Sequence, residues 1–534
     1  MRRIWTLIIF IIIGNQYVSA QNYPTYKITA LDSESKGFYY LCPINGIYGK
    51  PVGPTHMILD NKGKVIYFKS FKIGASTNDF KVWPNGLMSY NYKGKYYLMD
   101  SSFKVVDSVY SKNGAVPDLH DMQILPNGHF LLMGTENVKM DLSSYHYFNQ
   151  KDSPGSKNAI VVSGVIQEQD KNKNIVFEWH AKGHFAFDDV DSFYLNSPTF
   201  VDWTHFNAFE YDNDSNILLS VRWFDEITKI NRKDGSIIWR MGGKRNQFSF
   251  VNDTNGFLGQ HDIRRITNGN ITMYDNGRGG IPFHPATARE YKLDETLHTA
   301  TLVWSYVNDP KVYSFAIGNA QRLSNGNTLV DYGIVLKANQ FFNVINQAKT
   351  KVFEIVFDDS LTGYRSFNYF SLPWKLNRPQ ITCSLLSGKY YLDAGLGYSK
   401  YLWSTGDTSR TIEAKGGADS FSVFVSVGDG GMIRSEPFIT SDHTNPCSFT
   451  GIDKMNDLPR FSIFPNPVND DFILESSSFQ KRNVRYQVFD ITGKILKDVQ
   501  IQPFTNKIQI PVNDLSPGIY SIAIDGINKK FIKD

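Results

Sequence analysis

Hydrophobic and polar residues alternate in short stretches over the first two thirds of the chain, and many of these stretches meet at an Asn-Gly or Asp-Gly turn. Alternation with a period of two buries one face of a β-strand, and Asn-Gly is a strong hairpin signal because both residues tolerate a positive φ. The hairpin turns fall at Asp60-Asn61-Lys62-Gly63, Pro84-Asn85-Gly86, Pro126-Asn127-Gly128, Asp212-Asn213-Asp214, Asn268-Gly269 and Asn325-Gly326. The pattern predicts an all-β fold built from hairpins.

The hairpins recur as larger units, several of which close with an aromatic strand that ends in a charged turn. Six such units fit between about residues 37 and 358. One four-stranded unit cannot bury both faces of its sheet, whereas radial stacking of several units does so. The series therefore favours a six-bladed β-propeller over residues 24–370, although a β-sandwich is the alternative for any single stretch. An excursion at residues 135–172 is expected to form an extended hairpin.

The sequence pattern changes after the sixth unit, where short strands of alternating residues are separated by Gly and Asp turns. Residues 377–445 read as a small immunoglobulin-like β-sandwich, because strands of this length with frequent turns are typical of that fold. A polar linker at residues 446–459 leads to a last module at residues 460–534, which is expected to be a small β-sandwich as well.

The first 20 residues have the three-part layout of a secretory signal peptide. Two arginines precede an apolar block at residues 4–13, and Val18-Ser19-Ala20 suits cleavage after Ala20. Ten apolar residues are too few to span a hydrocarbon layer of about 30 Å. The sequence therefore predicts an exported protein with no transmembrane segment in the mature chain.

Composition narrows the possible functions. Hydrophobic residues make up 41% of the chain, which is enough for large cores, and the formal net charge is only +4 with no Lys/Arg run, so nucleic-acid binding is not expected. Three cysteines exclude a disulfide framework, although Cys383 and Cys447 could form one bridge. Because no cysteines cluster near a histidine, a zinc site is not expected, and the sequence suggests no cofactor.

Three histidines occupy matching positions in different units. His120, His205 and His261 each stand seven residues before the turn of their own hairpin. A propeller brings equivalent positions of its blades together at one mouth of the central channel. A single histidine in a strand is more often a structural, hydrogen-bonded residue, but three aligned histidines among only 11 in the chain favour a site.

Arg222 and Asn207 are expected to join the histidines. Arg222 lies on the return strand of the His205 hairpin, and Asn207 lies two residues beyond His205 on the same strand face. An arginine alone usually sits on a surface, but beside several imidazoles and with no nearby carboxylate cluster it suits an anion. Neutral imidazole is a competent nucleophile, so transfer of a sulfuryl or phosphoryl group fits these side chains.

The segments that carry these residues resemble the bacterial arylsulfotransferase family. The resemblance rests on DWTHFNAFEYDNDSNILLSVRW, WRMGG and GQHDIRRITNGNITMYDNGRG, with LHDMQILPNG and WHAKGHFAFDDVD in matching order. It spans residues 24–358 and implies a six-bladed propeller without a cofactor. The implied reaction moves a sulfuryl group from an aryl sulfate ester to a phenolic acceptor, by a ping-pong mechanism through a sulfohistidine and without a nucleotide donor.

Carried over residue by residue, the resemblance places the family's functional side chains on five positions. The nucleophile falls on His261, and the second histidine and the asparagine fall on His205 and Asn207. Arg222 and His120 match the remaining two. As hypotheses, Arg222 and Asn207 hold the non-bridging oxygens, His205 stabilises the leaving phenolate and His120 is the acid/base partner. His120 and His205 could exchange these two roles.

The last module resembles the type A sorting domain of type IX secretion cargo. FPNP at residues 464–467, VFDITG at residues 488–493 and LSPGIY at residues 515–520 carry the resemblance. It implies that the type IX secretion machinery is a partner and that the protein is exported through the outer membrane, then secreted or attached to the cell surface.

Two other functions stay open at this point. A metal-dependent propeller hydrolase would need carboxylates and amides around a central cation, whereas the aligned positions offer histidine and arginine. A non-catalytic surface propeller that binds glycans or proteins would suit the exported, multi-domain layout, since a fold alone does not establish chemistry. The presence of all five side chains favours the enzyme.

Overall fold

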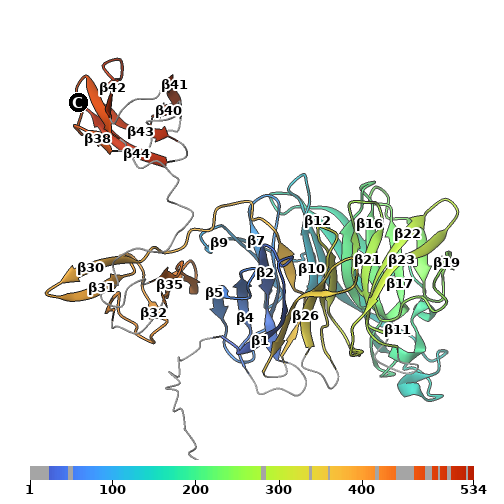
Figure 1. Cartoon of the computed structure of the whole chain (residues 1–534). Coiled ribbons are helices and arrows are strands. Elements are labelled where there is room, and N and C mark those ends of the chain that lie inside the picture. Colours follow the sequence, from blue (N-terminus) through green and yellow to red (C-terminus); the bar gives the residue numbers. More distant parts are fainter. Residues whose placement is uncertain are drawn as a thin grey trace, which may run out of the picture. The chain divides into compact units, whose positions relative to one another are not determined.

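The computed structural model describes residues 23–45, 52–277, 284–335, 340–358, 361–414, 420–439, 462–475, 484–490, 494–501, 507–524 and 527–534. Regular structure in these residues is almost entirely β, with four single-turn 3-10 helices (Figure 1). None of the described helices is long and apolar enough to cross a membrane. The expected signal peptide at residues 1–20 lies outside the described residues.

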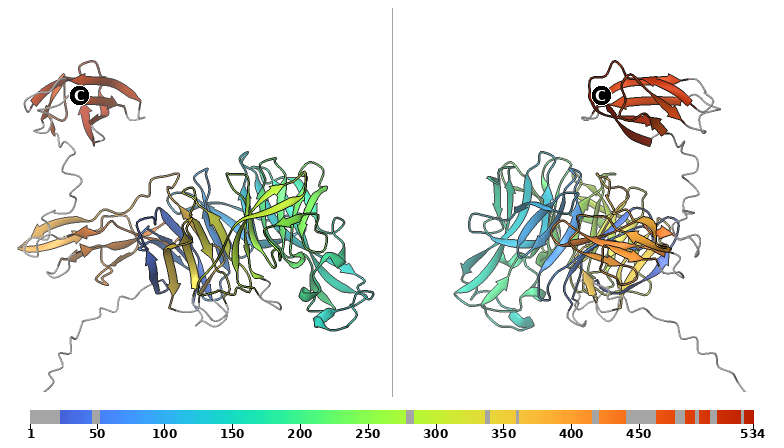
Figure 2. Two further views of the ribbon diagram at one scale, coloured as in Figure 1. Left: turned by 45° about the vertical axis from the view of Figure 1, so that its right-hand side comes forward. Right: turned by 90° about the vertical axis from the view of Figure 1, so that its left-hand side faces the viewer.

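Within the described part of the chain, six sheets each contain a core of four antiparallel strands. Figure 2 shows the propeller from two further directions. The sheets are β6 (Thr77–Val82), β7 (Met88–Tyr92), β8 (Lys95–Met99) and β9 (Val105–Val109); β10 (Val116–Ile124), β11 (Phe130–Met140), β12 (Ala159–Gln169) and β13 (Ile175–His180); β15 (Phe206–Tyr211), β16 (Ile217–Val221), β17 (Glu226–Ile230) and β18 (Ile237–Gly242); β20 (His261–Arg265), β21 (Ile271–Asp275), β22 (Thr287–Asp294) and β23 (Thr299–Val307); β24 (Asn319–Arg322), β25 (Thr328–Asp331), β26 (Gln340–Ile345) and β27 (Lys351–Phe357); and β29 (Phe367–Tyr369), β2 (Phe38–Leu41), β4 (Thr55–Leu59) and β5 (Val65–Ser70). The first strand of each sheet contacts the first strand of a neighbour, as in β10 against β15 and β15 against β20. The all-β propeller prediction is confirmed.

The ring of sheets is closed by strands from both ends of the propeller segment. β1 (Tyr26–Leu31) pairs with β27 at the outer edge of one sheet, and β29 pairs with β2 at the inner edge of the next. A short additional pair joins β3 (Pro43–Asn45) to β28 (Leu361–Gly363). Between the two sheets, the Tyr39 and Phe353 rings stack with their centroids 4.2 Å apart. Closure removes exposed inner edges, which would otherwise be free to pair with another chain.

Four of the inner strands are interrupted by bulges. The register shifts between Asn78 and Lys81 in β6, within residues 117–122 of β10, between Phe206 and Ala208 in β15, and between His261 and Arg264 in β20. A bulge re-aims the side chains around it and ends regular pairing. The predicted site histidines therefore lie where the inner ladder breaks.

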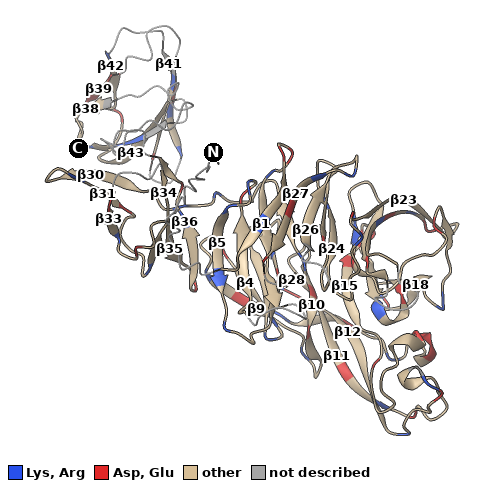
Figure 3. Ribbon diagram, turned by 60° about the horizontal axis from the view of Figure 1, so that its bottom comes forward, with Lys and Arg blue, Asp and Glu red and all other residues tan. Residues whose placement is uncertain are grey.

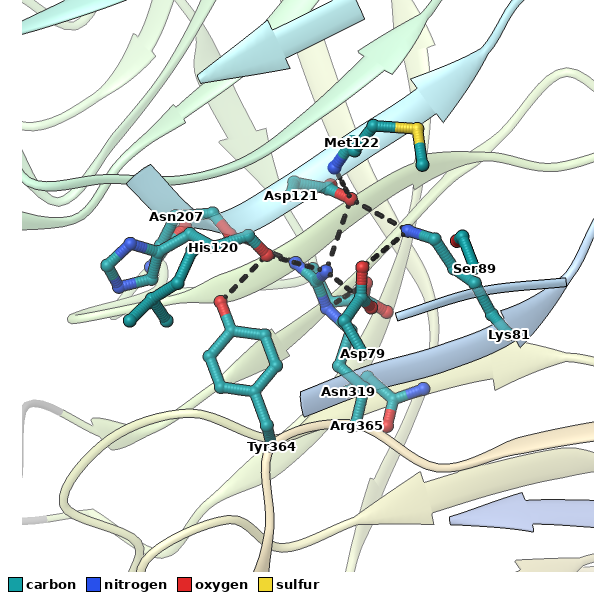
Figure 4. A network of polar contacts seen from close by, with 12 residues as sticks. Asp79, Lys81, Ser89, His120, Asp121, Met122, Asn207, Asn319, Tyr364 and Arg365 are labelled. Carbon is teal, nitrogen blue, oxygen red and sulfur yellow. Dashed lines mark hydrogen bonds and ion pairs between the residues drawn. The ribbon is translucent and has the colours of Figure 1, made fainter. Parts of the chain in front are cut away.

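A buried charged network fills the centre of the propeller beside these bulges (Figure 4). Arg365 is 1% exposed, and its guanidinium lies 3.1–3.2 Å from carboxylate oxygens of Asp79, Asp121 and Asp262. Lys81 pairs with Asp79 and Asp121 as well, at 2.8 and 3.1 Å. Buried charges are tolerated only when each is paired and hydrogen-bonded, so the network ties the inner strands together.

The excursion of the second of these sheets is an extended hairpin, as expected. β11 and β12 pair continuously from Phe130 opposite Gln169 to Met140 opposite Ala159. The connection contains η1 (Phe148–Gln150), and β14 (Phe200–Asp202) runs parallel to the far end of β12. Two more short helices, η2 (Phe187–Asp189) and η3 (Ser192–Tyr194), follow β13. In the following sheet, β19 (Ser249–Val251) adds a parallel strand to β23.

The segment predicted as a separate immunoglobulin-like domain is partly joined to the propeller. Its strands are β30 (Thr382–Leu386), β31 (Lys389–Asp393), β32 (Tyr401–Trp403), β33 (Thr411–Glu413), β34 (Ser420–Phe421), β35 (Val423–Val427), β36 (Gly431–Arg434) and β37 (Phe438–Ile439). β36 pairs with β5, so that β36, β35 and β32 continue a propeller sheet. One compact unit accordingly runs to Glu413 and resumes over Phe421–Phe438. Cys383 is disulfide-bonded and Cys42 is free and buried, while Cys447, the expected partner, lies outside the described residues.

The last unit has its own core. Its strands are β38 (Ser462–Phe464), β39 (Asp471–Glu475), β40 (Val484–Phe489), β41 (Ile495–Ile501), β42 (Lys507–Pro511), β43 (Gly518–Ile524) and β44 (Ile527–Lys533). They form one sheet of three strands and one of four, and Phe472, Val488 and Ile522 are buried among them.

In the propeller, Lys and Arg are interspersed with Asp and Glu along the strands (Figure 3).

Candidate active site

The three aligned histidines converge at the inner strands. His120 lies within β10, His205 directly precedes β15 and His261 is the first residue of β20. The rings of His120 and His205 meet edge to face, with centroids 5.0 Å apart. The positive charges of Arg222, His205 and His120 all act to lower the pKa of His261. The two other histidines and Arg222 are therefore close enough to His261 to act on its imidazole electrostatically.

His261 is buried and neutral. It is 2% exposed, its Nδ1 lies 2.7 Å from Asn276 Oδ1, and its Nε2 lies 3.2 Å from the Ile317 backbone nitrogen. Burial is the main reason that its pKa is well below the ordinary value, and the Arg222 charge lowers it further, while the bond to Asn276 opposes the shift. The ring therefore stays unprotonated at neutral pH, and the lone pair of Nε2, which here accepts the Ile317 N–H, becomes available for nucleophilic attack once that hydrogen bond opens.

His205 and His120 each carry a carboxylate on Nδ1. His205 Nδ1 lies 2.5 Å from Asp202 Oδ2, and His120 Nδ1 lies 2.6 Å from Asp118 Oδ1. Burial raises the pKa of both carboxyls, but the neighbouring histidine outweighs it and both pKa values end below normal. The sequence indicated no carboxylate cluster near the cationic groups, but one carboxylate lies beside each of these two histidines. With Nδ1 engaged, Nε2 is the ring atom of each histidine that can serve a substrate.

Burial lowers the pKa of His205, and the charges of His120 and Arg222 act in the same direction, while Asp202 opposes them. A neutral histidine next to a carboxylate accepts a proton readily and returns it, which is what an acid/base group must do. The backbone of His205 adopts a left-handed φ of 48°, and its carbonyl accepts the Arg222 backbone N–H at 3.1 Å. His205 and Arg222 are thus held as one unit.

Arg222 starts η4 (Arg222–Phe224) and is 3% exposed. Its Nη2 donates to the Phe315 carbonyl at 2.7 Å, and its guanidinium carbon lies 4.2 Å from the Trp223 ring centroid. Among the described residues, its Nε has no hydrogen-bond partner although it is buried. A guanidinium held flat against an aromatic ring with a donor left over suits the oxygens of an anion.

Asn207 contacts the residue before His261, and its side-chain nitrogen already makes one hydrogen bond. It lies in β15, is fully buried, and its Nδ2 donates to the Gln260 carbonyl at 2.7 Å. Gln260 immediately precedes His261. The amide therefore holds the backbone next to the nucleophile, while its Oδ1 is buried without a hydrogen-bond partner among the described residues.

Two residues that follow β28 hydrogen-bond to the backbone of His120 and Asn207, and the sequence pattern did not reveal them. Tyr364 and Arg365 both donate to the His120 carbonyl at 2.9 Å, and Arg365 also donates to the Asn207 carbonyl at 2.9 Å (Figure 4). They come from a connection far from the histidines in sequence. No periodicity signals such a contact, whereas Asp118 and Asp202 could have been noticed as acids two and three residues before a site histidine.

Among the residues that the structure describes, no group of three or more His, Cys, Asp and Glu side chains is arranged to hold a metal ion. Two cavities are lined by residues other than the five predicted site residues. One of about 370 Å³ is lined by the 253–258 segment and by Asp225, and one of about 430 Å³ is lined by Arg264, Arg322 and Trp83 among others. Asp225 accepts the Gly259 N–H at 2.6 Å, which fixes the turn that leads into His261.

Comparison with known families gives two matches. The model of the arylsulfotransferase (ASST) family matches residues 48–365, and the model of the secretion system C-terminal sorting domain matches residues 462–534. The first match covers all five predicted site residues, and the second covers the last compact unit. No curated protein matches the sequence significantly.

Solved structures similar to the chain have little sequence in common with it. A protein of unknown function from Bacteroides caccae is 11% identical with a TM-score of 0.39, covering 62% of this chain and 99% of that one. Virginiamycin B lyase from Staphylococcus aureus is 9% identical with a TM-score of 0.30, covering 69% and 95%. PorZ, a surface component of the type IX secretion system of Porphyromonas gingivalis, is 11% identical with a TM-score of 0.26, covering 90% and 74%. At TM-scores below 0.5, these structures say nothing about the activity of this chain.

Proposed function

The chain belongs to the arylsulfotransferase family, and we propose that its propeller transfers a sulfuryl group from an aryl sulfate ester to a phenolic acceptor through a covalent intermediate on His261. The observation that carries the proposal is a buried His261 imidazole, 2% exposed, whose Nδ1 lies 2.7 Å from Asn276 Oδ1 and whose pKa the Arg222 guanidinium helps to lower. A neutral nucleophile beside a guanidinium suits an anionic electrophile.

In the first step, Nε2 of His261 attacks the sulfur and the bond between sulfur and the aryl oxygen breaks. The electron pair of that bond leaves on the phenolate, which takes a proton from Nε2 of whichever of His205 and His120 is protonated when the aryl sulfate binds. Phenols have a pKa near 10, so the leaving oxygen needs only modest help, and general acid catalysis typically contributes about 10²- to 10⁴-fold in rate. Asp202 and Asp118 hold the two rings in place for this task.

In the second step, the acceptor phenol gives its proton to the same histidine, and its oxygen attacks the sulfur. The bond between sulfur and Nε2 breaks, and the electron pair returns to His261. Throughout both steps the three non-bridging oxygens carry negative charge, which Arg222 and the remaining N–H of Asn207 stabilise. The aryl sulfate supplies the sulfuryl group, so no nucleotide donor takes part in the scheme.

The direct test is to trap the intermediate. We expect 4-nitrophenyl sulfate without an acceptor to release a burst of 4-nitrophenol. We expect added phenol to accelerate turnover, because it accepts the sulfuryl group from the enzyme. Mass spectrometry of the quenched enzyme should find one SO₃ group on the peptide that contains His261. An adduct on another residue would contradict the assignment of the nucleophile, and turnover without any burst or adduct would contradict the two-step mechanism.

Arg222 offers a second test. Replacing it by methionine keeps a side chain of similar length but removes every donor, and we expect kcat/KM for 4-nitrophenyl sulfate to fall by about 10²- to 10³-fold. Arg222→Lys keeps the charge without the planar fork, so its kcat/KM should lie between those of wild type and Arg222→Met. Arg245→Met is the matched control, because Arg245 is half exposed and pairs with Asp188 and Asp189. Equal activity of Arg222→Met and Arg245→Met would exclude Arg222 from substrate binding.

The C-terminal unit carries a secretion-system sorting domain, which indicates export and a surface or secreted location. We infer that the type IX machinery recognises this unit after the predicted signal peptide has directed the chain across the inner membrane. Sulfuryl transfer would then take place outside the cell, where a nucleotide sulfate donor is scarce and an aryl sulfate can serve instead.

A further inference from the structure

We propose that Asn276 is a positioning residue for sulfuryl transfer: its side-chain oxygen keeps the proton of His261 on Nδ1, so that Nε2 is the atom that attacks sulfur. The proposal deepens the function proposed above and rests on it. Asn276 directly follows β21, which pairs with β20, and it is 1% exposed.

The orientation of the Asn276 amide follows from its other contacts. Its Nδ2 lies 2.9 Å from the Ile317 carbonyl oxygen and 2.9 Å from Ser314 Oγ. A carbonyl oxygen can only accept, so the nitrogen end of the amide must face Ile317. The oxygen end therefore faces His261, with Oδ1 2.7 Å from Nδ1.

The tautomer of His261 follows in turn. Nδ1 has two neighbours, Asn276 Oδ1 and the Gly259 carbonyl at 3.2 Å, and both are acceptors. Nδ1 must therefore carry the proton. On the other side of the ring, the Ile317 backbone N–H lies 3.2 Å from Nε2 and can only donate. Both sides of the imidazole thus require a lone pair on Nε2.

The backbone conformation of Ile317 supports this assignment of the His261 tautomer. Its φ is 56°, in the left-handed region that a β-branched residue avoids, and Gly318 follows with a φ of 99°. This unfavourable backbone turns one peptide so that the N–H of Ile317 faces His261 while its carbonyl faces Asn276. Asn276 is the side chain that joins both ends of the arrangement, because it contacts the imidazole with its oxygen and Ile317 with its nitrogen.

Removing the Asn276 side-chain amide should allow the proton of His261 to move between the two ring nitrogens. Without Asn276, Nδ1 has only the longer contact to Gly259, and the Ile317 peptide loses the side chain that hydrogen-bonds its carbonyl. The proton can then move to Nε2, where it blocks attack on sulfur. Partners that orient a functional histidine from its other nitrogen commonly contribute about 10- to 100-fold to its function. The charged groups that act on the ring, Arg222, His205 and His120, are unchanged by the substitution.

Two variants and a control test the proposal kinetically. Asn276→Ala is expected to slow formation of the sulfuryl enzyme about 100-fold. Asn276→Asp keeps an acceptor for Nδ1–H and adds a negative charge, so it should raise the pKa of His261 and move the acidic limb of the kcat/KM profile to higher pH, with a higher rate than Asn276→Ala above that limb. Asn270→Ala, in the turn of the same hairpin, should match wild type because Asn270 contacts only Glu290 through its side-chain nitrogen. Equal rates and identical pH limbs for the two Asn276 variants would mean that Asn276 merely supports the fold.

A measurement that does not depend on activity separates this proposal from the proposed function. In histidine-labelled full-length protein, the ¹⁵N resonances of His261 are assigned by their loss in His261→Ala. We expect a protonated Nδ1 and an unprotonated Nε2 in wild type, and a shift toward protonated Nε2 in Asn276→Ala. A protonated Nε2 in wild type would overturn the proposal. A wild-type protein with the expected spectrum but no sulfuryl transfer would overturn the proposed function and leave the assignment of the tautomer intact.

Discussion

His261→Ala is expected to lower transfer of the sulfuryl group from 4-nitrophenyl sulfate to phenol by about 10⁴-fold or more, and to abolish hydrolysis with it. The reason is that His261 supplies the only atom that bonds to sulfur in both steps of the proposed mechanism. Removing a nucleophile ends the covalent route, whereas removing a group that only assists lowers the rate in part. Initial rates of 4-nitrophenol release, with and without phenol, give the measurement.

His146→Ala is the matched control for this experiment. His146 also has a carboxylate on Nδ1, that of Asp152, but it lies exposed in the β11–β12 connection. Its loss should leave both rates unchanged. Since His261 is buried, His261→Gln provides a second variant of closer volume, and thermal unfolding of each variant shows whether it is folded. A folded His261 variant that retains wild-type transfer would rule out His261 as the nucleophile.

Arg365→Met is expected to destabilise the propeller by about 3–5 kcal/mol, the largest effect on stability that we predict. Arg365 is surrounded by Asp79, Asp121 and Asp262, and these carboxylates lie in the interior with little water to replace its charge. Its positive charge, together with those of Arg264 and Lys81, holds the pKa of Asp121 far below normal against the effect of burial. Arg365→Met therefore removes one of the three positive charges that offset the burial of Asp121.

Urea unfolding followed by tryptophan fluorescence measures this effect, because most of the nine tryptophans lie in the propeller segment. Arg410→Met is the control, since Arg410 pairs with Asp393 at 2.9 Å and both side chains are at least 30% exposed. An exposed ion pair contributes about 0–1 kcal/mol, so this variant should unfold near the wild-type midpoint. Equal midpoints for the two variants would show that the central network contributes little to stability.

Much of the fold could be read from local patterns because hairpins are decided locally. Gly128, Gly269 and Gly326 adopt φ values of 81°, 87° and 87°, as the predicted turns require. The alternation of apolar and polar residues then sets which face of each strand is buried. The alignment of His120, His205 and His261 followed from the same turns, since equal spacing from a turn places residues at equal heights on neighbouring inner strands.

The joining of β36 to β5 illustrates what local patterns could not show. Both strands were expected, but whether a strand pairs within its own module or with another depends on which sheet edge is open after closure of the ring. The same holds for the carboxylates beside His205 and His120, which the predicted site did not include.

The sequence by itself determined the strands, their turns, the family and the five side-chain types of the candidate site, because each of these depends on residues close together in the chain or on an ordered motif. Only the tertiary structure decided which atom of His261 carries the proton and what holds it, because Asn276 meets the ring across the β20–β21 pair and Ile317 meets it from the neighbouring sheet, 56 positions along the chain. Hydrogen bonds and ion pairs act over about 3 Å, and no spacing along a chain reports a separation that small between residues more than 50 positions apart.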